Sequence, residues 1–329
     1  MLPPTLQSRT LQRLSLPEPA RQAWLRDASA LRYPDPQDFT AWRAFVDASV
    51  ALGKRYLPEP MQQSLRAFIA PEGPEAIIFQ NLPVDAVLPP PPADGKRPLG
   101  KGAVSEAVMA GLVEQHATIF AYSNEKSGAP IHEITPVEGQ EHVPSSSGRA
   151  PFACHTDVAF LAPRFSPTGL ILFGLLNEPG APTAVLPLDR ILEAAPEALV
   201  RSLEKPIFRH PAPASFEIAA ATVEPILRRD AGGVSHIAVQ THAVQPLNDE
   251  ARAAIAELRE LLDAVESDRY VLQPGVALLF KNDRVLHGRD AFKGSRWLQR
   301  AYFTDSIAAL RERTGEKGFV FDARVLTNA

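Results

Sequence analysis

The chain has 329 residues, 45% of them hydrophobic, so it can bury a large core as one domain or as one domain with a helical annex. Its 34 Lys and Arg against 38 Asp and Glu give a formal net charge of −4, which leaves no electrostatic footprint for a nucleic acid or an anionic membrane. The longest apolar run, residues 169–176, is far below the roughly 18 residues that a bilayer span needs. One cysteine, Cys154, excludes an internal disulfide framework. With no targeting pattern at the N-terminus, we expect a soluble cytoplasmic protein without nucleic-acid or membrane partners.

Residues 1–75 are predicted to form a helical segment that packs on the rest of the chain. Apolar residues at helical spacing indicate a helix at 17–31, a second one capped by Asp38, and a third short one around 61–69. The positions that share a face are Trp24, Leu25, Ala28 and Leu31 in the first helix and Phe39, Trp42, Phe45, Val46 and Val50 in the second. This aromatic stripe is most simply a packing face.

Residues 76–329 are predicted to form a β-rich core with helices packed outside it. Apolar runs bounded by turn residues indicate strands at 76–82, 169–176, 183–188, 235–240 and 276–280. Helices are expected at 105–116 and, as an insertion in the core, around 249–265, and Asp189 is a candidate cap for a further helix. We expect irregular structure in two stretches rich in proline, 88–93 and 199–229.

A candidate metal site combines His155 and Asp157 with the distant His287. Two residues apart on an extended strand, His155 and Asp157 point to the same face and can hold one ion, whereas Cys154 alternates to the opposite face and is expected in the core. Two histidines and one carboxylate leave three adjacent coordination positions open, which is the usual setting for a non-haem Fe(II) oxygenase. The remaining candidates lack partners at ligand spacing and are predicted not to bind metal; they are His116, His132, His142 and His210.

These motifs, in this order, resemble the Fe(II)/2-oxoglutarate dioxygenases of the taurine dioxygenase and clavaminate synthase-like family. Within that family they are most similar to the branch that hydroxylates free amino acids such as arginine or asparagine. The residues that carry the resemblance are 155–160, 168–172, Thr183, 287–292 and 296–300, and the match spans roughly residues 75 to 305. The resemblance implies an all-β core with flanking helices, folded as a double-stranded β-helix or jelly roll. It also implies Fe(II), 2-oxoglutarate and O₂.

The resemblance also assigns binding roles. Thr183 would donate a hydrogen bond to the distal carboxylate of 2-oxoglutarate, and Arg296 would pair with that C5 carboxylate, because a guanidinium offers two parallel hydrogen bonds. Arg300 would then face the carboxylate of the substrate, although the two arginines could exchange roles. Asn124 and Glu125 occupy the region that contacts the substrate amino group in the amino-acid hydroxylases.

Two further features concern the substrate. In the arginine-hydroxylating relatives an acidic pair near the position of Gln240 receives the guanidinium, but this chain has Gln240, Thr241 and His242 there. Gln240 is therefore a candidate contact for a different substrate, and arginine is not expected. The polar loop at residues 138–149 comes just before the metal motif and is a candidate lid.

The reaction expected from the resemblance is hydroxylation of an unactivated carbon of a free amino acid or an amino-acid-derived small molecule. It is coupled to decarboxylation of 2-oxoglutarate to succinate. The presence of Asp157 argues against halogenation, for which the carboxylate ligand is absent in this group. Three alternatives stay open: desaturation or cyclisation in natural-product biosynthesis by the same cofactors, a non-catalytic jelly-roll binding protein with a vestigial metal site, and a metal hydrolase that uses Zn²⁺ without O₂.

Overall fold

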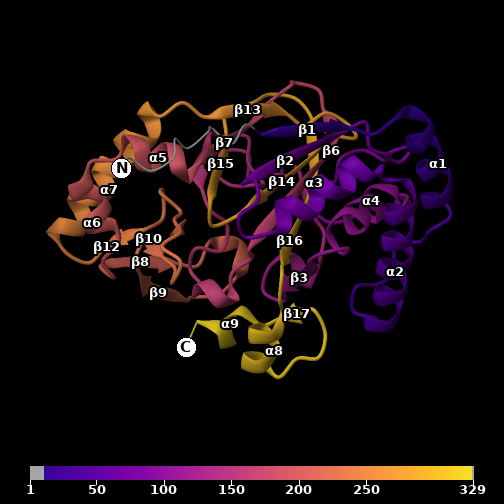
Figure 1. Cartoon of the computed structure of the whole chain (residues 1–329). Coiled ribbons are helices and arrows are strands. Elements are labelled where there is room, and N and C mark those ends of the chain that lie inside the picture. Colours follow the sequence, from indigo (N-terminus) through magenta and orange to yellow (C-terminus); the bar gives the residue numbers. More distant parts are fainter. Residues whose placement is uncertain (1–10, 328–329) are drawn as a thin grey trace.

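The structure is a computed structural model that describes residues 11–327, and two β-sheets form its centre (Figure 1). Among the described residues the larger sheet has eight strands in the order β1-β2-β14-β6-β16-β3-β17, with β4 paired to β16. The smaller sheet has four strands in the order β13-β7-β15-β5. The larger sheet contains β1 (Gln12–Ser15), β2 (Ala76–Gln80), β3 (Thr118–Tyr122), β4 (His132–Ile134), β6 (Gly169–Asn177), β14 (Ala277–Lys281), β16 (Arg296–Thr304) and β17 (Val320–Phe321). The smaller sheet contains β5 (Phe152–His155), β7 (Pro182–Pro187), β13 (Asp268–Val271) and β15 (Val285–Arg289).

The chain crosses between the two sheets with nearly every strand of the core. It passes from β5 in the smaller sheet to β6 in the larger and back to β7, and later from β14 in the larger sheet through β15 to β16. The pairs β6–β14, β6–β16, β7–β15 and β5–β15 are all antiparallel. This alternation is the winding of a double-stranded β-helix, and it confirms the jelly roll expected from the resemblance.

Two apolar clusters sit on opposite faces of the smaller sheet. Val185 and Val285 belong to the larger cluster, which also takes side chains from β6 and β14 and therefore fills the space between the sheets. Their neighbours Leu186 and Leu286 belong to the smaller cluster on the outer face. Side chains alternate along a strand, so a continuous apolar run can bury both of its faces.

Helices from the N-terminal part cover the larger sheet. They are α1 (Glu18–Ala28), α2 (Phe39–Tyr56) and α3 (Glu59–Ile69), with α4 (Val104–Val113) from the core packed against α2. Asp38 caps α2 as expected, because its Oδ1 accepts a hydrogen bond of 2.9 Å from the Ala41 amide. The segment also contributes β1, which pairs in parallel with β2. The first ten residues of the predicted helical segment lie outside the described residues.

Three helices cover the outer face of the smaller sheet, at the opposite end of the molecule from α1 and α2 in Figure 1. They are α5 (Leu188–Ala194), α6 (Glu197–Leu203) and α7 (Asp249–Ala264). The expected cap at Asp189 is wrong: Pro187 occupies the N-cap of α5, and the Asp189 carboxylate accepts from Arg284 at 2.9 Å. Cys154 packs against this cluster, half-buried rather than in the central core, and burial raises the pKa of its thiol to about 11.

The stretch predicted to be irregular, 199–229, contains regular elements. Besides the end of α6 it forms β8 (Phe208–Pro211), β9 (Ala221–Glu224) and β10 (Leu227–Arg229), which pair in two small sheets with β11 (Ser235–Ile237) and β12 (Gln245–Pro246). Strands of three or four residues between prolines are too short to show a period in the sequence. The remaining elements are α8 (Ala308–Thr314), α9 (Ala323–Leu326) and the single turns η1 (Lys126–Gly128), η2 (Pro163–Phe165) and η3 (Ala214–Phe216). No helix within residues 11–327 is both long and apolar enough to cross a membrane.

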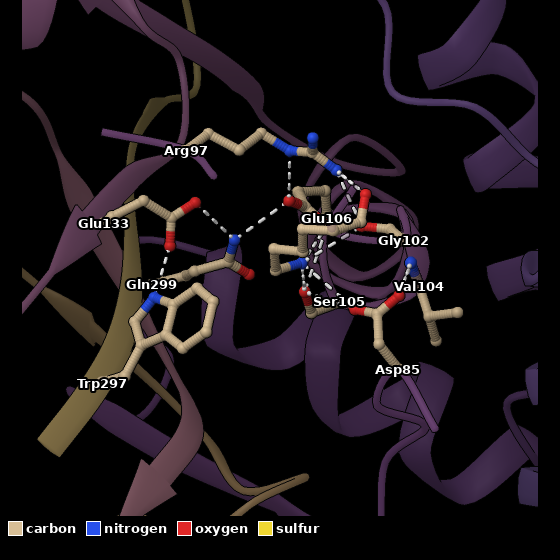
Figure 2. Close-up of polar contacts among 10 residues, drawn as sticks. Asp85, Arg97, Gly102, Val104, Ser105, Glu106, Glu133, Trp297 and Gln299 are labelled. Carbon is tan, nitrogen blue, oxygen red and sulfur yellow. Dashed lines mark hydrogen bonds and ion pairs between the residues drawn. The ribbon is translucent and has the colours of Figure 1, made fainter. Parts of the chain in front are cut away.

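A buried polar network joins α4 to β16 (Figure 2). The Lys101 ammonium is fully buried and donates to Asp85 at 3.1 Å and to Glu106 at 2.8 Å. The Gln299 amide donates to Glu106 at 3.1 Å and to Glu133 at 3.0 Å. Burial and the nearby Glu106 raise the pKa of Glu133. The network ties the N-terminal half of the chain to the strand that carries Arg296 and Arg300.

Candidate metal and cosubstrate site

The three predicted metal ligands converge in the structure. His155 ends β5 and lies directly opposite His287 on the neighbouring antiparallel strand β15. The Nε2 atoms of His155 and His287 lie 3.3 Å and 3.9 Å from Asp157 Oδ1, and all three side chains are buried. One ligand atom from each residue lies within 4.8 Å of the others, and among residues 11–327 no other group of three such side chains meets this condition.

Asp157 reaches the site by a different route from the one predicted. Strand β5 ends at His155, so Asp157 lies in the following turn and not on the same strand face. The Asn282 side chain fixes this turn: its Oδ1 accepts from the Asp157 amide at 2.9 Å, and its Nδ2 donates to the Asp157 carbonyl at 2.9 Å. Val158 then adopts a φ of 59°, which is rare for a β-branched residue. Asn282 therefore positions Asp157, a role that no motif in the sequence indicates.

The electrostatics of His287 and Asp157 suit a divalent metal. The His155 ring places Nδ1 2.9 Å from the Ala153 carbonyl and directs Nε2 toward Asp157 Oδ1, at 3.3 Å. Burial and the neighbouring His155 lower the pKa of His287 to about 3, which keeps it neutral. Burial opposes ionisation of Asp157, but the Arg300 charge and the His155 hydrogen bond outweigh it and hold the pKa of this carboxyl below its usual range. A neutral imidazole at His287 and an ionised carboxylate at Asp157 are the forms in which these side chains ligate metal.

Arg296 and Thr183 form a second buried group beside the triad. Arg296 begins β16 and donates through Nη2 to Thr183 Oγ1 at 3.1 Å. Its side chain is 5% exposed, its Nε has no hydrogen-bond partner, and no carboxylate of the described residues lies within ion-pair distance. Burial and the nearby Arg289 lower the pKa of Arg296 to about 9, so it stays charged at neutral pH. A buried guanidinium without an anion fits the distal carboxylate of a dicarboxylic acid.

Arg300 lies four residues further along β16 and bridges two carboxylates. Its Nη1 donates to Asp157 at 2.8 Å, and its Nη2 donates to Glu125 and to His132 Nδ1, both at 2.8 Å. Burial raises the pKa of Glu125. His132, which was predicted not to bind metal, instead accepts a hydrogen bond from Arg300, a contact that the sequence did not predict. The signal was available only in the pairing of β4 with β16, which places His132 opposite Arg300.

A cavity of about 1140 Å³ opens on the side of the triad where Arg300 lies. Glu125, Asp157, Arg300 and Gln240 line it, and Oε1 of Gln240 is buried without a hydrogen-bond partner. The predicted lid contributes Gln140, Val143, Pro144, Ser145, Ser146 and Ser147 to the wall. Asn124 is not among the lining residues, because its side-chain oxygen accepts from the Ala323 amide at 2.7 Å.

Backbone strain is concentrated around this cavity. Of the described non-glycine residues with positive φ, four line the cavity wall: Lys126, Ser127, Val158 and Glu217. Such conformations are costly and tend to persist at functional sites. The strain therefore points to the same place as the triad.

Comparison with known proteins agrees with this geometry. The model of the taurine catabolism dioxygenase TauD, TfdA family matches residues 102–302. L-asparagine oxygenase of Streptomyces coelicolor is 27% identical over 319 residues, which cover 92% of this chain and 90% of that protein. Clavaminate synthase 2 of Streptomyces clavuligerus is 27% identical over 295 residues, covering 83% and 88%.

Solved structures extend the similarity to the fold. A crystal structure of asparagine oxygenase in complex with Fe(II), 2S,3S-3-hydroxyasparagine and succinate matches with a TM-score of 0.83 at 25% identity and covers 94% of this chain and 99% of that one. The non-haem iron oxygenase OrfP in complex with Fe, succinate and (3S)-hydroxy-L-Arg matches with a TM-score of 0.79 at 21% identity, covering 94% and 99%, which is a likeness of fold alone. Because the family model spans more than half of the sequence, the chain belongs to the taurine catabolism dioxygenase TauD, TfdA family.

Proposed function

We propose that this protein is an Fe(II)- and 2-oxoglutarate-dependent oxygenase that hydroxylates an unactivated carbon of a free amino acid or an amino-acid-derived small molecule. The observation that carries the proposal is the buried group of His155, Asp157 and His287 beside Arg296, a guanidinium that lacks an anion. Bound Fe(II), 2-oxoglutarate and O₂ would supply the oxidising chemistry, with one oxygen atom entering succinate and the other the product. The side chains of the protein would bind and orient the substrate and the cosubstrate and exclude water.

In this proposal Arg296 and Thr183 bind the C5 carboxylate of 2-oxoglutarate. The Thr183 hydroxyl already contacts Nη2 of Arg296 at 3.1 Å, so both donors can address one carboxylate. Full burial keeps water from competing for the guanidinium, which strengthens the charge-assisted hydrogen bonds. The arginine thereby sets the position of the cosubstrate relative to the metal ligands.

Arg300 and Glu125 would bind the head group of the substrate. An amino acid is a zwitterion, and an ion pair of 2.8 Å between a guanidinium and a carboxylate offers a complement to each of its charges. The substrate carboxylate would take Arg300 and the ammonium would take Glu125. Because Arg300 also contacts the metal ligand Asp157, the head group would be held at a set distance from the metal. The side-chain oxygen of Asn124 already accepts a hydrogen bond from the Ala323 amide, so we assign the substrate ammonium to Glu125 alone.

The side chain of the substrate would extend toward Gln240. The cavity wall there carries Gln240 and His242 and no acidic pair, which disfavours a guanidinium. The unpartnered Oε1 of Gln240 favours a neutral group that donates a hydrogen bond. A cytoplasmic location also belongs to the proposal, supported by a chain with a single cysteine.

The test is a succinate-release screen of the common amino acids and their simple derivatives with Fe(II), 2-oxoglutarate and ascorbate. We expect one group of substrates to raise succinate release, with a product that gains one oxygen atom by mass. His155→Ala and Asp157→Ala should abolish turnover, and the exposed Arg201→Ala should not. A product that loses two hydrogens would indicate desaturation instead. If the Mn(II)-loaded protein failed to bind 2-oxoglutarate in calorimetry, or if Zn²⁺ supported turnover without O₂, the proposal would be wrong.

A further inference from the structure

One short stretch, residues 287–296, joins three parts of the site. It begins with the metal ligand His287 and ends with Arg296, the guanidinium assigned to 2-oxoglutarate. Between them lie Arg289 and Phe292, which neither the metal nor the cosubstrate uses in the proposal above. Both are buried, at 8% and 9% exposure.

The Arg289 guanidinium donates hydrogen bonds to the backbone of the loop 138–149. Its Nη2 donates to the Gly148 carbonyl at 2.9 Å and to the Ser145 carbonyl at 3.2 Å, and its Nη1 donates to the Asp290 carbonyl at 3.1 Å. Every acceptor is a neutral carbonyl, and no carboxylate of the described residues forms an ion pair with this guanidinium. Ser145 lies in the wall of the substrate cavity, so the loop that Arg289 fixes is the one that covers the substrate.

Phe292 links this anchor to the cosubstrate site. The guanidinium carbon of Arg289 lies 4.6 Å from the centre of the Phe292 ring, and that of Arg296 lies 5.8 Å from it. The Phe292 amide also donates to the Arg149 carbonyl at the end of the loop, at 3.2 Å. Two buried like charges thus share one aromatic ring, and they repel each other when no anion is bound.

We propose that Arg289 is a positioning residue that couples binding of 2-oxoglutarate at Arg296 to closure of the loop 138–149 over the substrate cavity. The inference rests on the proposed function, because it needs a carboxylate at Arg296. That carboxylate would neutralise Arg296, remove its repulsion of Arg289, and leave Phe292 and Arg289 held against the loop. The cosubstrate would then raise the affinity for the amino acid, and by linkage the amino acid would raise the affinity for 2-oxoglutarate by the same factor.

The experiment measures hydrogen exchange of the backbone amides of residues 138–149 by mass spectrometry, in full-length protein loaded with Mn(II). In the wild type, saturating 2-oxoglutarate should slow exchange in this loop at least tenfold. In Arg289→Met it should slow exchange less than twofold, although 2-oxoglutarate still binds in calorimetry. Arg269→Met is the matched control, because this exposed arginine pairs with Asp290, next to Arg289, and does not touch the loop; it should keep the wild-type response.

A second variant covers the case in which Arg289→Met does not fold. Phe292→Leu keeps the hydrogen bonds of Arg289 but removes the ring that both guanidiniums share, and it should also lose the response to 2-oxoglutarate. Equal protection by 2-oxoglutarate in the wild type and in both variants, or no protection in the wild type despite binding, would overturn the coupling. Failure of the proposed function looks different: a protein whose loop responds to 2-oxoglutarate but which releases no succinate with any substrate would support the coupling and refute the activity.

Discussion

The buried charge of Arg296, unpaired within residues 11–327, should have two consequences: it strengthens binding of 2-oxoglutarate, and it lowers the free energy of unfolding without ligand. Replacing Arg296 with Met tests both. In the wild type Arg296 is 5% exposed, and among the described residues its guanidinium donates a hydrogen bond only to the Thr183 hydroxyl, so the folded protein already bears the desolvation of this charge. A bound carboxylate then meets a dehydrated, preorganised partner. In Arg296→Met the same carboxylate would enter the site without a cation, and affinity for 2-oxoglutarate should fall.

The size of the loss follows from the burial. Truncating one partner of a buried, hydrogen-bonded charge pair costs about 2–5 kcal/mol. The lower part of that range applies here, because Met is shorter than Arg and leaves room for water beside the carboxylate. A loss of about 2–3 kcal/mol corresponds to an increase of about 30- to 150-fold in the dissociation constant, at about 1.4 kcal/mol per tenfold. The free energy of unfolding without 2-oxoglutarate should stay the same or rise, since an apolar side chain replaces an unpaired buried charge.

The assay is calorimetric titration of 2-oxoglutarate into the Mn(II)-loaded variant, with urea unfolding of the same protein without ligand. Arg296→Lys keeps the charge but not the planar fork and should fall between the wild type and Arg296→Met. Arg190→Met, at a partly exposed arginine on α5, should match the wild type. An unchanged affinity in Arg296→Met, or an equal loss of affinity and of unfolding free energy, would refute the assignment.

Three further predictions concern other parts of the chain. His132→Leu removes one of the two acceptors for Nη2 of Arg300 and should raise the KM for the amino acid about tenfold, with the KM for 2-oxoglutarate unchanged in steady-state assays. Parallel changes in both constants would contradict this role. Burial lowers the pKa of His210 from 6.5 to about 4, so the unfolded chain binds the proton more tightly. The free energy of unfolding should therefore fall by about 3 kcal/mol as pH falls from above 6.5 toward 4, because the unfolded chain takes up the proton first. Urea unfolding of His210→Gln should depend less on pH than that of the wild type. The same pH dependence of the unfolding free energy in both proteins would contradict this prediction. Asn248→Ala removes the N-cap of α7, whose side-chain oxygen accepts a 2.8 Å hydrogen bond from the Ala251 amide, and should lower the free energy of unfolding by about 1 kcal/mol. Asn248→Asp keeps an acceptor and should not lower it. Equal denaturation midpoints for Asn248→Ala and the wild type would refute the role of the cap.

Much of the fold could be predicted because its longer elements carry a local signal. The helices α2 and α7 show apolar faces with a period of 3.6, and β6 is a run of apolar residues bounded by turns. The family resemblance supplied the jelly roll, which periodicity alone would not have distinguished from other β-rich folds. The strands between 208 and 229 were missed, because pairing with partners elsewhere in the chain stabilises them more than their own sequence does.

The sequence by itself determined which side chains were available for chemistry: two histidines, a carboxylate and two arginines four residues apart. The tertiary structure decided how they meet. Asp157 points to the candidate metal site because Asn282, from the turn after β14, holds its backbone. Arg300 contacts His132 because β4 and β16 pair in the register that sets these two residues opposite each other. These contacts join residues more than a hundred positions apart, and such distances are closed only by the pairing and packing of the sheets, which no local pattern of side chains encodes.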